Sequence, residues 1–421
     1  MTLSTKNIFQ NITKLAFGEG LGRIISFAVA PLLTRIYSPD DMGVLAVYTS
    51  LIAMVVPFST CRYSLAIPVC KSEKTAVNLM MSCFTILLAG TLLLFFLLEI
   101  AGYDLLEFLN MKILWQYWYL LPVGFLCHGL YEICSQYSIR KKTLTALAKA
   151  TVIQKITGSL FKIGLGLLSF KPVGLLIGDL MTQTGGLTVL LRSYWSDLRA
   201  NIHSISCSRM SYALKRYWKF PFYRVPSQIL LAAAGSLPVM YFAYQFDTKV
   251  TGQIGIARTM LSIPVTFIGH SVGKAYFAEI ARLGNNKTEE IYTLTVSIVK
   301  KLFLVSLLPF LLVILLGPWI FETVFGSQWY DSGIYARLFA IYLIFQFIYS
   351  PISEGVFNVF EKQSSVFYLE SSRFVIIIST LLMAYVLSLN PIDTILIYSV
   401  GLALQYVISL MVVYKILKPS I

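Results

Sequence analysis

The chain is poor in charged residues, which make up 13% of its 421 positions, whereas soluble domains typically have roughly 25%. Acidic residues are especially scarce, because 20 Asp and Glu stand against 34 Lys and Arg and leave a net charge of +14. The three histidines have no partner at a spacing that suits a metal ligand. This composition excludes an ordinary soluble domain and gives no support to a histidine-based metal centre.

The cysteines do not indicate a metal site, and motifs for nucleotide binding or nucleophilic catalysis are missing from the sequence. The six cysteines are scattered without metal spacing, so we expect small core hydrophobes rather than ligands or disulfides. The sequence contains no Walker motif and no nucleophile elbow, so we do not expect ATP hydrolysis by this chain. A polar N-terminus leads straight into an apolar segment without a small-residue cleavage site, so no cleavable signal peptide is expected.

Long apolar runs dominate the chain instead. Apolar residues make up 57% of the sequence, and runs of about 18 or more recur along its whole length. We therefore expect an all-α polytopic membrane protein with about twelve transmembrane helices. The predicted spans are 12–34, 43–69, 75–99, 114–138, 146–169, 172–194, 219–245, 251–277, 292–316, 333–357, 366–388 and 391–414.

The cations in the loops predict the orientation. The loops after odd-numbered spans hold 4 Lys and Arg, whereas the other loops and both tails hold 17. Cytoplasmic loops carry the excess of Lys and Arg, so both termini are expected in the cytoplasm. The longest cytoplasmic loop, about 195–218, separates two groups of six spans. We therefore expect an N-terminal six-helix lobe over 1–210 and a C-terminal one over 211–421.

The two predicted lobes share a faint repeat. Six spans per lobe would give both lobes the same orientation, which predicts parallel repeats with a substrate site at their interface. The matching residues are Pro31, Tyr37, Asp40, Gly43 and Pro57 in the first lobe and Pro238, Tyr244, Asp247, Gly252 and Pro264 in the second.

Thirteen of the 34 Lys and Arg residues fall inside predicted spans, when Arg192 and Lys219 at two span ends are counted with the loop between them. Buried cations at membrane depth are costly and usually functional. Arg62 and Arg258 have no acidic neighbour at helical spacing, and the arginine fork suits a phosphate ligand. Alternatively, either arginine snorkels or pairs across the bundle with Glu132, Asp179 or Glu354.

Two further groups of intramembrane cations have both a structural and a functional interpretation. Arg23 follows Glu19 by four residues, which favours either a neutralised ion pair or an arginine that faces a cavity. Lys155 and Lys162 are seven residues apart and share a helix face, which predicts that they face a lumen rather than lipid.

The candidate site therefore consists of cations and a few acids. The expected substrate-binding or translocation residues are Arg23, Arg62, Arg258, Lys274, Arg224, Lys155, Lys162 and Arg373. For those nearest the cytoplasmic ends, Arg224, Lys274 and Arg373, snorkelling is the alternative. The acids expected to couple transport to protons or to balance charge are Glu19, Glu132, Asp179 and Glu354.

Ser38, Pro39, Asp40 and Asp41 form the pattern of a helix start. Ser38 suits the N-cap position, proline the first helical position, and the acids the positive end of the helix dipole. An acidic pair in the first outside loop is also typical of lipid-dependent glycosyltransferases, where it binds metal or acts as a base. Helix capping explains the pattern without any further assumption.

Three segments resemble the Wzx-type O-antigen flippases, in the polysaccharide-transporter branch of the multidrug/oligosaccharidyl-lipid/polysaccharide exporter (MOP) superfamily. They are Ala30–Gly43 (APLLTRIYSPDDMG), Arg62–Ile67 (RYSLAI), and Gly255–Arg258 followed by Leu261–Pro264. The resemblance extends to the length of the chain and the number of spans. One position departs from it, because the family often has Glu where Ser64 stands. Arg62 is therefore expected to be freer than usual.

The resemblance implies two six-helix lobes in a MATE-like V around a central cationic cavity. It implies that undecaprenyl-pyrophosphate-linked O-antigen repeat units move from the cytoplasmic to the periplasmic leaflet of the bacterial inner membrane, as part of lipopolysaccharide biosynthesis. The implied motion is alternating access, driven by an ion gradient or the membrane potential without a cofactor or metal. The implied partners are the lipid-linked oligosaccharide, membrane lipids, a polysaccharide polymerase and a chain-length regulator, with no nucleic acid.

Two other functions stay open at this point. A membrane glycosyltransferase, polymerase or ligase acting on the same lipid would need a catalytic outside loop, and no predicted outside loop is long. A MATE-like exporter of another substrate would share the fold, but an excess of lumen cations disfavours cationic drugs. We therefore expect a transporter and not an enzyme.

Overall fold

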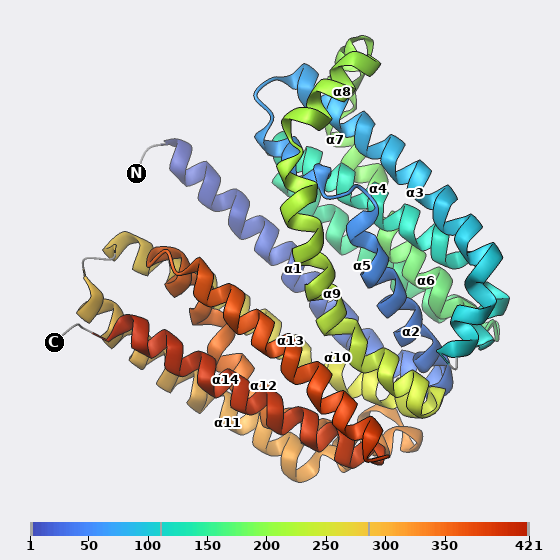
Figure 1. Cartoon of the computed structure of the whole chain (residues 1–421), viewed down its shortest axis with the longest axis vertical. Helices are drawn as coiled ribbons and strands as arrows, with labels where there is room; N and C mark the ends of the chain where they lie inside the picture. Colours follow the sequence, from blue (N-terminus) through green and yellow to red (C-terminus); the bar gives the residue numbers. More distant parts are fainter. Residues whose placement is uncertain (1–2, 110–111, 285–286, 419–421) are drawn as a thin grey trace. The chain divides into compact units, whose positions relative to one another are not determined.

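The computed structural model describes the backbone of residues 3–109, 112–284 and 287–418, and within these ranges the side chains from residue 18 onward except 19, 113, 267, 270, 271 and 363. Every regular element in these ranges is helical (Figure 1). The α-helices are α1 (Leu3–Ile36), α2 (Pro39–Val55), α3 (Glu73–Phe108), α4 (Leu120–Arg140), α5 (Leu144–Leu167), α6 (Val173–Thr184), α7 (Leu187–Asn201), α8 (Cys207–Arg216), α9 (Lys219–Gln245), α10 (Thr248–Leu283), α11 (Thr288–Phe325), α12 (Tyr330–Val359), α13 (Gln363–Val386) and α14 (Pro391–Leu417). Short 3₁₀ helices are η1 (Val56–Phe58), η2 (Tyr63–Val69), η3 (Lys112–Tyr117), η4 (Ile202–Ser204) and η5 (Ser327–Trp329). The predicted all-α fold is confirmed.

The chain divides into two compact units, Met1–Lys249 and Val250–Ile421. The first contains α1 to α9, because α9 packs against α2 rather than against the helices that follow it. The lobes expected from the sequence divide earlier, at 210/211, between the two halves of the predicted repeat.

A helix occupies every predicted span, but three spans are interrupted. The fourth, 114–138, begins in η3 and is α-helical only from Leu120. The second, 43–69, is α-helical only as far as Val55 and continues as η1 and η2. Pro57 lies at this break, where its missing N–H cannot continue the α-helical hydrogen bonding. The sixth, 172–194, breaks at Gly185 and Gly186, where a Cβ on Gly186 would lie 2.7 Å from the carbonyl oxygen of Ala150. Tertiary contact between α5 and this break therefore requires glycine.

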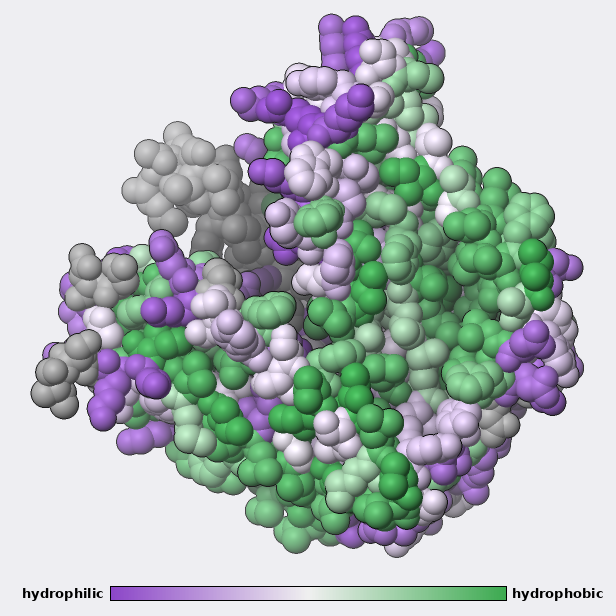
Figure 2. All heavy atoms as spheres, viewed as in Figure 1, coloured by the Kyte–Doolittle hydropathy of each residue, from purple (hydrophilic) through white to green (hydrophobic). Residues whose placement is uncertain are grey.

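Eight helical segments of the described chain are long and apolar enough to cross a membrane. They are 39–58, 73–108, 173–204, 219–245, 288–325, 327–359, 364–386 and 391–417. Several leucines and phenylalanines of α3 are more than half exposed, including Leu92, Leu93 and Phe96, and Figure 2 shows apolar surface over much of each unit. Apolar patches of this extent need a lipid environment. The protein is therefore a multi-span membrane protein.

Close helix contacts hold the first unit together. A Cβ on Gly18 of α1 would lie 2.8 Å from the Cβ of Ala148 on α5, so small residues let these backbones approach. Where α3 begins and α4 ends, Glu73 accepts a 2.6 Å hydrogen bond from the Tyr137 hydroxyl and a 3.1 Å hydrogen bond from Arg140.

Lys141 extends this charged cluster to α7. Its Nζ lies 2.9 Å from Glu73 Oε1 and 3.1 Å from Asp197 Oδ2. Burial opposes the charged form, but the hydrogen bonds to the two carboxylates prevail and raise the pKa of Lys141. The cluster therefore fixes the ends of α3, α4 and α7 to one another.

Candidate functional site

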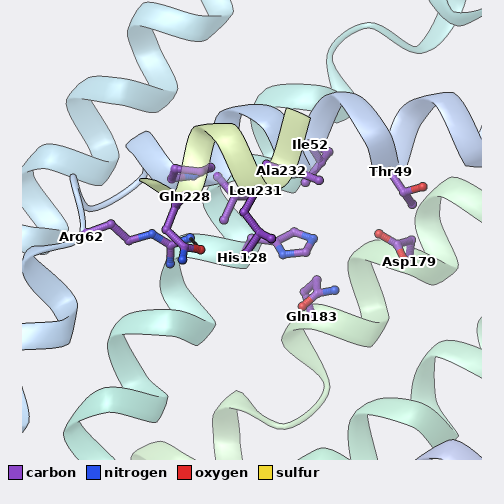
Figure 3. Close-up of a pocket in the computed structure, with 12 residues that line it drawn as sticks. Thr49, Ile52, Arg62, His128, Asp179, Gln183, Gln228, Leu231 and Ala232 are labelled. Atoms are coloured by element: carbon purple, nitrogen blue, oxygen red, sulfur yellow. Dashed lines mark hydrogen bonds between the residues drawn. The ribbon is translucent and has the colours of Figure 1, made fainter. Parts of the chain in front are cut away.

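The first unit contains a cavity of about 420 Å³ whose walls come from α2, η1, α4, α6 and α9 (Figure 3). Its apolar wall consists of Ile52, Ala53, Val56, Pro57, Leu231 and Ala232. Its polar lining consists of Thr49, Arg62, His128, Asp179, Gln183 and Gln228. A mostly apolar cavity with a few convergent polar groups is the usual form of a ligand site.

The break after α2 positions Arg62. This residue has φ 58°, in the left-handed region, and directly precedes η2. A non-glycine residue in this region is strained by about 1–2 kcal/mol, so the surrounding packing must hold it there. Irregular backbone at membrane depth occurs where it is buried in protein or lines a cavity, as it does here. The break therefore turns the Arg62 side chain into the cavity.

The Arg62 guanidinium contacts two helices at once. Its Nη1 donates to Glu132 Oε1 of α4 at 3.0 Å, and its Nη2 donates to Gln228 Oε1 of α9 at 3.1 Å. Ser64 Oγ donates to the same Glu132 oxygen at 2.6 Å. Arg62 and Glu132 are only 16% and 14% exposed, so the ion pair is largely shielded from solvent. The expectation that Arg62 is freer than usual is wrong. Ser64 stands where the related flippases often have Glu, but Glu132 of α4 provides a carboxylate that pairs with Arg62 instead.

The opposite end of the cavity is acidic. Figure 3 shows Arg62 and Gln228 at one end of the cavity and Thr49 and Asp179 at the other. Asp179 Oδ1 lies 3.9 Å from Lys162 Nζ on α5, so one predicted lumen lysine neutralises one predicted acid. At this distance the pair is loose, which leaves the carboxylate available to accept further hydrogen bonds.

The cavity can therefore bind a ligand that is both anionic and rich in hydroxyls. The Arg62 fork suits a phosphate oxygen pair, and the amides of Gln183 and Gln228 both donate and accept. Asp179 accepts hydrogen bonds from hydroxyl groups. The described side chains form no group of three or more His, Cys, Asp or Glu residues that could hold a metal ion.

The first unit also brings together the predicted cations of α1 and α5. A Cβ on Gly22 would lie 3.2 Å from Lys155 Cγ, so the stem of this lysine packs on α1 one position from Arg23. Arg23 and Lys155 are half-buried and lie within electrostatic range of each other. The side chain of Glu19 lies outside the described residues, so the predicted Glu19–Arg23 pair stays a prediction.

The second unit has its own arginine cluster, among tyrosines of α12 and α14. Arg258 of α10 hydrogen-bonds to Tyr342 and is electrostatically coupled to Tyr398 and Tyr406. The Tyr342 and Tyr398 ring centroids are 6.0 Å apart, and those of Tyr342 and Tyr406 are 6.5 Å apart. Arg373 of α13 donates to the Tyr406 hydroxyl at 3.5 Å.

Arg373 also pairs with Glu370 on its own helix. The tyrosines thus link two predicted site residues that lie on different helices of the second unit. The remaining predicted residues, Arg224, Lys274 and Glu354, have exposed side chains and do not line the cavity of the first unit.

Three residues that line the cavity are not among those predicted from the sequence. Gln183 and Gln228 line the cavity, yet neutral amides were not considered among the charged candidates. His128 was set aside because it lacked a partner at metal spacing, but it lines the same cavity. Polar residues inside apolar spans were the available signal, because a membrane helix tolerates them mainly where they face other polar groups.

An interrupted span that lines a polar cavity within a bundle of apolar helices is a feature found in membrane transporters. A family model described as "Polysaccharide biosynthesis protein" matches residues 32–333, and the chain belongs to this family. The search of curated proteins gives no match.

Solved structures share the fold over nearly the whole chain. The lipid II flippase MurJ in an inward closed conformation has a TM-score of 0.70 at 15% identity. The alignment covers 96% of this chain and 87% of the MurJ chain. A multidrug resistance MATE family transporter of the MOP superfamily has a TM-score of 0.64 at 13% identity, with 97% and 96% covered. A MOP superfamily transporter from Pyrococcus furiosus has a TM-score of 0.57 at 11% identity, with 97% and 96% covered. The predicted MATE- and MOP-like fold is confirmed.

Proposed function

We propose that this protein is a flippase that moves undecaprenyl-pyrophosphate-linked O-antigen repeat units from the cytoplasmic to the periplasmic leaflet of the bacterial inner membrane. The observation that carries the proposal is Arg62, which projects from a broken span into a polar cavity within the first unit. Membership of a polysaccharide biosynthesis family supports a glycan substrate. The fold shared with a protein named as a lipid II flippase supports a lipid-linked one.

The chemistry of the substrate agrees with these groups. A diphosphate and many sugar hydroxyls cannot cross hydrocarbon without a large desolvation cost. Arg62 would replace water around a phosphate, while Gln183, Gln228 and Asp179 would hydrogen-bond to sugar hydroxyls. The apolar polyisoprenoid chain would stay in the bilayer throughout.

The two units would take part in one transport cycle. We propose alternating access, in which the arginine cluster of the second unit provides further contacts for the anion through Arg258 and Arg373. Glu132 would compete with the substrate phosphate for Arg62. The phosphate would displace the Glu132 carboxylate when the substrate binds, and Glu132 would pair with Arg62 again when the substrate leaves. An ion gradient or the membrane potential would drive the cycle, with Glu132 and Asp179 as candidate coupling acids and without a cofactor. A polymerase and a chain-length regulator would then use the exported units.

A transporter fits the acidic pair of the first loop better than an enzyme does. Asp41 Oδ2 accepts hydrogen bonds from the Ser38 backbone N–H at 2.9 Å and from Ser38 Oγ at 2.8 Å, and Ser38 Oγ in turn caps Asp41 N–H. This is a capping box, so Asp41 serves helix α2. Asp40 accepts a hydrogen bond from Thr248. Both acids therefore have structural partners, which supports helix capping and loop packing as their role.

Loss of the protein should leave lipid-linked repeat units on the cytoplasmic leaflet, and Arg62→Ala should fail to restore surface glycan in such a strain. We expect a reduction of about tenfold or more, because a charge-assisted hydrogen bond contributes about 1.5–3 kcal/mol. The measurements are surface-glycan immunoblots and the leaflet distribution of the lipid-linked units. Arg23→Ala and Arg258→Ala are tested in parallel.

Arg282→Ala is the matched control. Arg282 is exposed and pairs with Glu279 three residues earlier, so its loss should leave surface glycan unchanged. Each variant must be present in the membrane at the level of the parent protein. Normal surface glycan in all three cavity and cluster variants would exclude a cationic substrate site.

A further inference from the structure

The region around α8 forms a strongly basic surface. Residues 198–246, from the end of α7 to just beyond α9, contain six Lys and Arg and no Asp or Glu. Figure 2 shows hydrophilic atoms gathered at the end of the first unit where α7 and α8 lie. This surface lies outside the cavity described above, and the flippase proposal makes no use of it.

Helix α8 is held firmly against α3. Its Ala213 is fully buried, and the Tyr63 hydroxyl donates to the carbonyl oxygen of Leu214 at 3.3 Å. Asn78 of α3 donates to the Ser204 carbonyl at 3.0 Å and accepts from the Ser206 N–H at 3.0 Å. The helix therefore has a fixed inner face, and its outer face keeps a constant direction.

The outer face of α8 carries cations around a tyrosine. Arg209, Tyr212, Lys215 and Arg216 are all exposed. Arg216 lies 5.9 Å from the Tyr217 ring centroid. The hydrogen bond to Tyr217 and, to a smaller extent, the interaction with Tyr212 raise the pKa of Arg216, so this side chain stays positively charged. No ion pair among the described residues includes these three cations or Lys219. The face therefore presents several unneutralised positive charges.

An aromatic shelf adjoins these charges where α9 begins. Trp218, Phe222 and Tyr223 are 49%, 62% and 64% exposed. Their rings form consecutive edge-to-face contacts, at 5.6 Å between Trp218 and Phe222 and 5.0 Å between Phe222 and Tyr223. The shelf coincides with the first residues of the candidate span 219–245. Exposed Trp and Tyr at a span end are typical of the boundary between headgroups and hydrocarbon.

We propose that Arg209, Lys215, Arg216 and Lys219, together with Tyr212 and Trp218, form a binding surface for the phosphate headgroups of anionic phospholipids. The positive-inside prediction places this surface at the cytoplasmic leaflet. Polybasic segments beside a membrane attract anionic lipids, and an aromatic shelf at headgroup level holds the cations where the phosphates lie. A basic surface facing open solvent would suit other polyanions, but the aromatic shelf and the apolar span that follows it favour the membrane boundary for this one. The proposal does not depend on the flippase activity.

Native mass spectrometry of the purified full-length protein tests this proposal with two added lipids, phosphatidylglycerol and phosphatidylcholine. The wild type should bind phosphatidylglycerol preferentially. The variant Arg209→Gln/Lys215→Gln/Arg216→Gln should bind phosphatidylglycerol roughly tenfold more weakly, because lipid attraction falls with each charge removed. Its binding of phosphatidylcholine should not change. Unchanged affinity for phosphatidylglycerol in this variant would overturn the proposal.

The control removes three cations elsewhere. Lys362, Lys415 and Lys418 are exposed and lie outside the predicted spans on the same predicted side of the membrane, so their replacement by Gln should leave the affinity for phosphatidylglycerol close to that of the wild type. An equal loss in this control would show a net-charge effect and would overturn the assignment to α8.

Two further measurements test whether the triple variant is folded and whether the surface binds soluble anions instead of lipid. The lipid-free unfolding midpoint of the triple variant should match that of the wild type, and Lys215→Gln/Lys219→Gln provides a milder variant if the triple one does not fold. Inorganic diphosphate is added as a competitor. Displacement of phosphatidylglycerol by an equimolar amount of inorganic diphosphate would assign the surface to soluble anions and overturn the lipid proposal.

Discussion

Arg62 projects into the cavity where the second predicted span stops being α-helical, and it joins a carboxylate of α4 to an amide of α9. The Arg62–Glu132 pair is largely shielded, so its contribution differs from that of a surface pair. Removal of one partner leaves the other charge buried without compensation, whereas removal of both does not. The pair is therefore suited to a site where a substrate anion replaces Glu132.

We expect Arg62→Gln and Glu132→Gln each to lower the unfolding midpoint of the purified protein and the double variant to be less destabilised than the sum of the two. A coupling of about 1 kcal/mol or more is expected for groups that share a hydrogen-bonded ion pair. The measurement is a double-mutant cycle by thermal unfolding in one detergent. Strictly additive effects would show that the two side chains do not interact in the membrane-extracted protein.

Helix packing at the element scale depends on glycines that allow close approach. On α5, a Cβ on Gly158 would collide with the Thr182 side chain and lie 3.0 Å from the Gly178 carbonyl oxygen of α6. Gly164 on the same helix has no atom within 4 Å of its would-be Cβ. Two glycines on one helix thus have opposite packing environments, and α6 carries Asp179 of the cavity.

Gly158→Ala should therefore lower the unfolding midpoint by an amount equivalent to about 1–3 kcal/mol, because overpacking forces α5 and α6 apart. Gly164→Ala should be neutral or slightly stabilising, since alanine is a better helix former than glycine by about 1 kcal/mol. Both variants are compared by thermal unfolding and by membrane expression level. The same response from both would mean that the α5–α6 contact does not limit stability.

The whole molecule is a two-unit membrane protein, and the uneven distribution of loop cations predicts its orientation in the membrane. Cys207, at the start of α8, is the exposed cysteine of the chain. The excess of Lys and Arg around it predicts a cytoplasmic position. Ser388, in the exposed loop between α13 and α14, is predicted on the other side.

A membrane-impermeant thiol reagent should label Cys207 in inverted membrane vesicles and leave it unlabelled in intact cells. A Cys207→Ser/Ser388→Cys variant should show the reverse pattern, since the two positions are separated by the bilayer. The readout is the mass shift of the protein after labelling. Labelling of Cys207 from outside intact cells would contradict the predicted orientation of both termini.

The sequence by itself determined the helices, the apolar spans and the capping box at Ser38, because these depend on neighbours within a few residues. Hydropathy runs and N-cap chemistry are local, so they can be recognised without the fold. Pro57 is a local signal for the break after Val55, but it predicts neither the left-handed conformation of Arg62 nor the η2 helix that follows. The local rules nevertheless identified Arg62, because an arginine in hydrocarbon stands out in any fold.

Only the tertiary structure decided the partners of Arg62. Glu132 lies 70 residues away in the chain and Gln228 lies 166 away, and no periodicity connects positions so far apart. Packing of α4, α6 and α9 around the broken span turned scattered polar residues into one cavity, while Arg224 and Lys274 were left at exposed positions. The packing of helix faces determines which intramembrane charges come into contact. This packing depends on side-chain shape along whole helices rather than on local sequence.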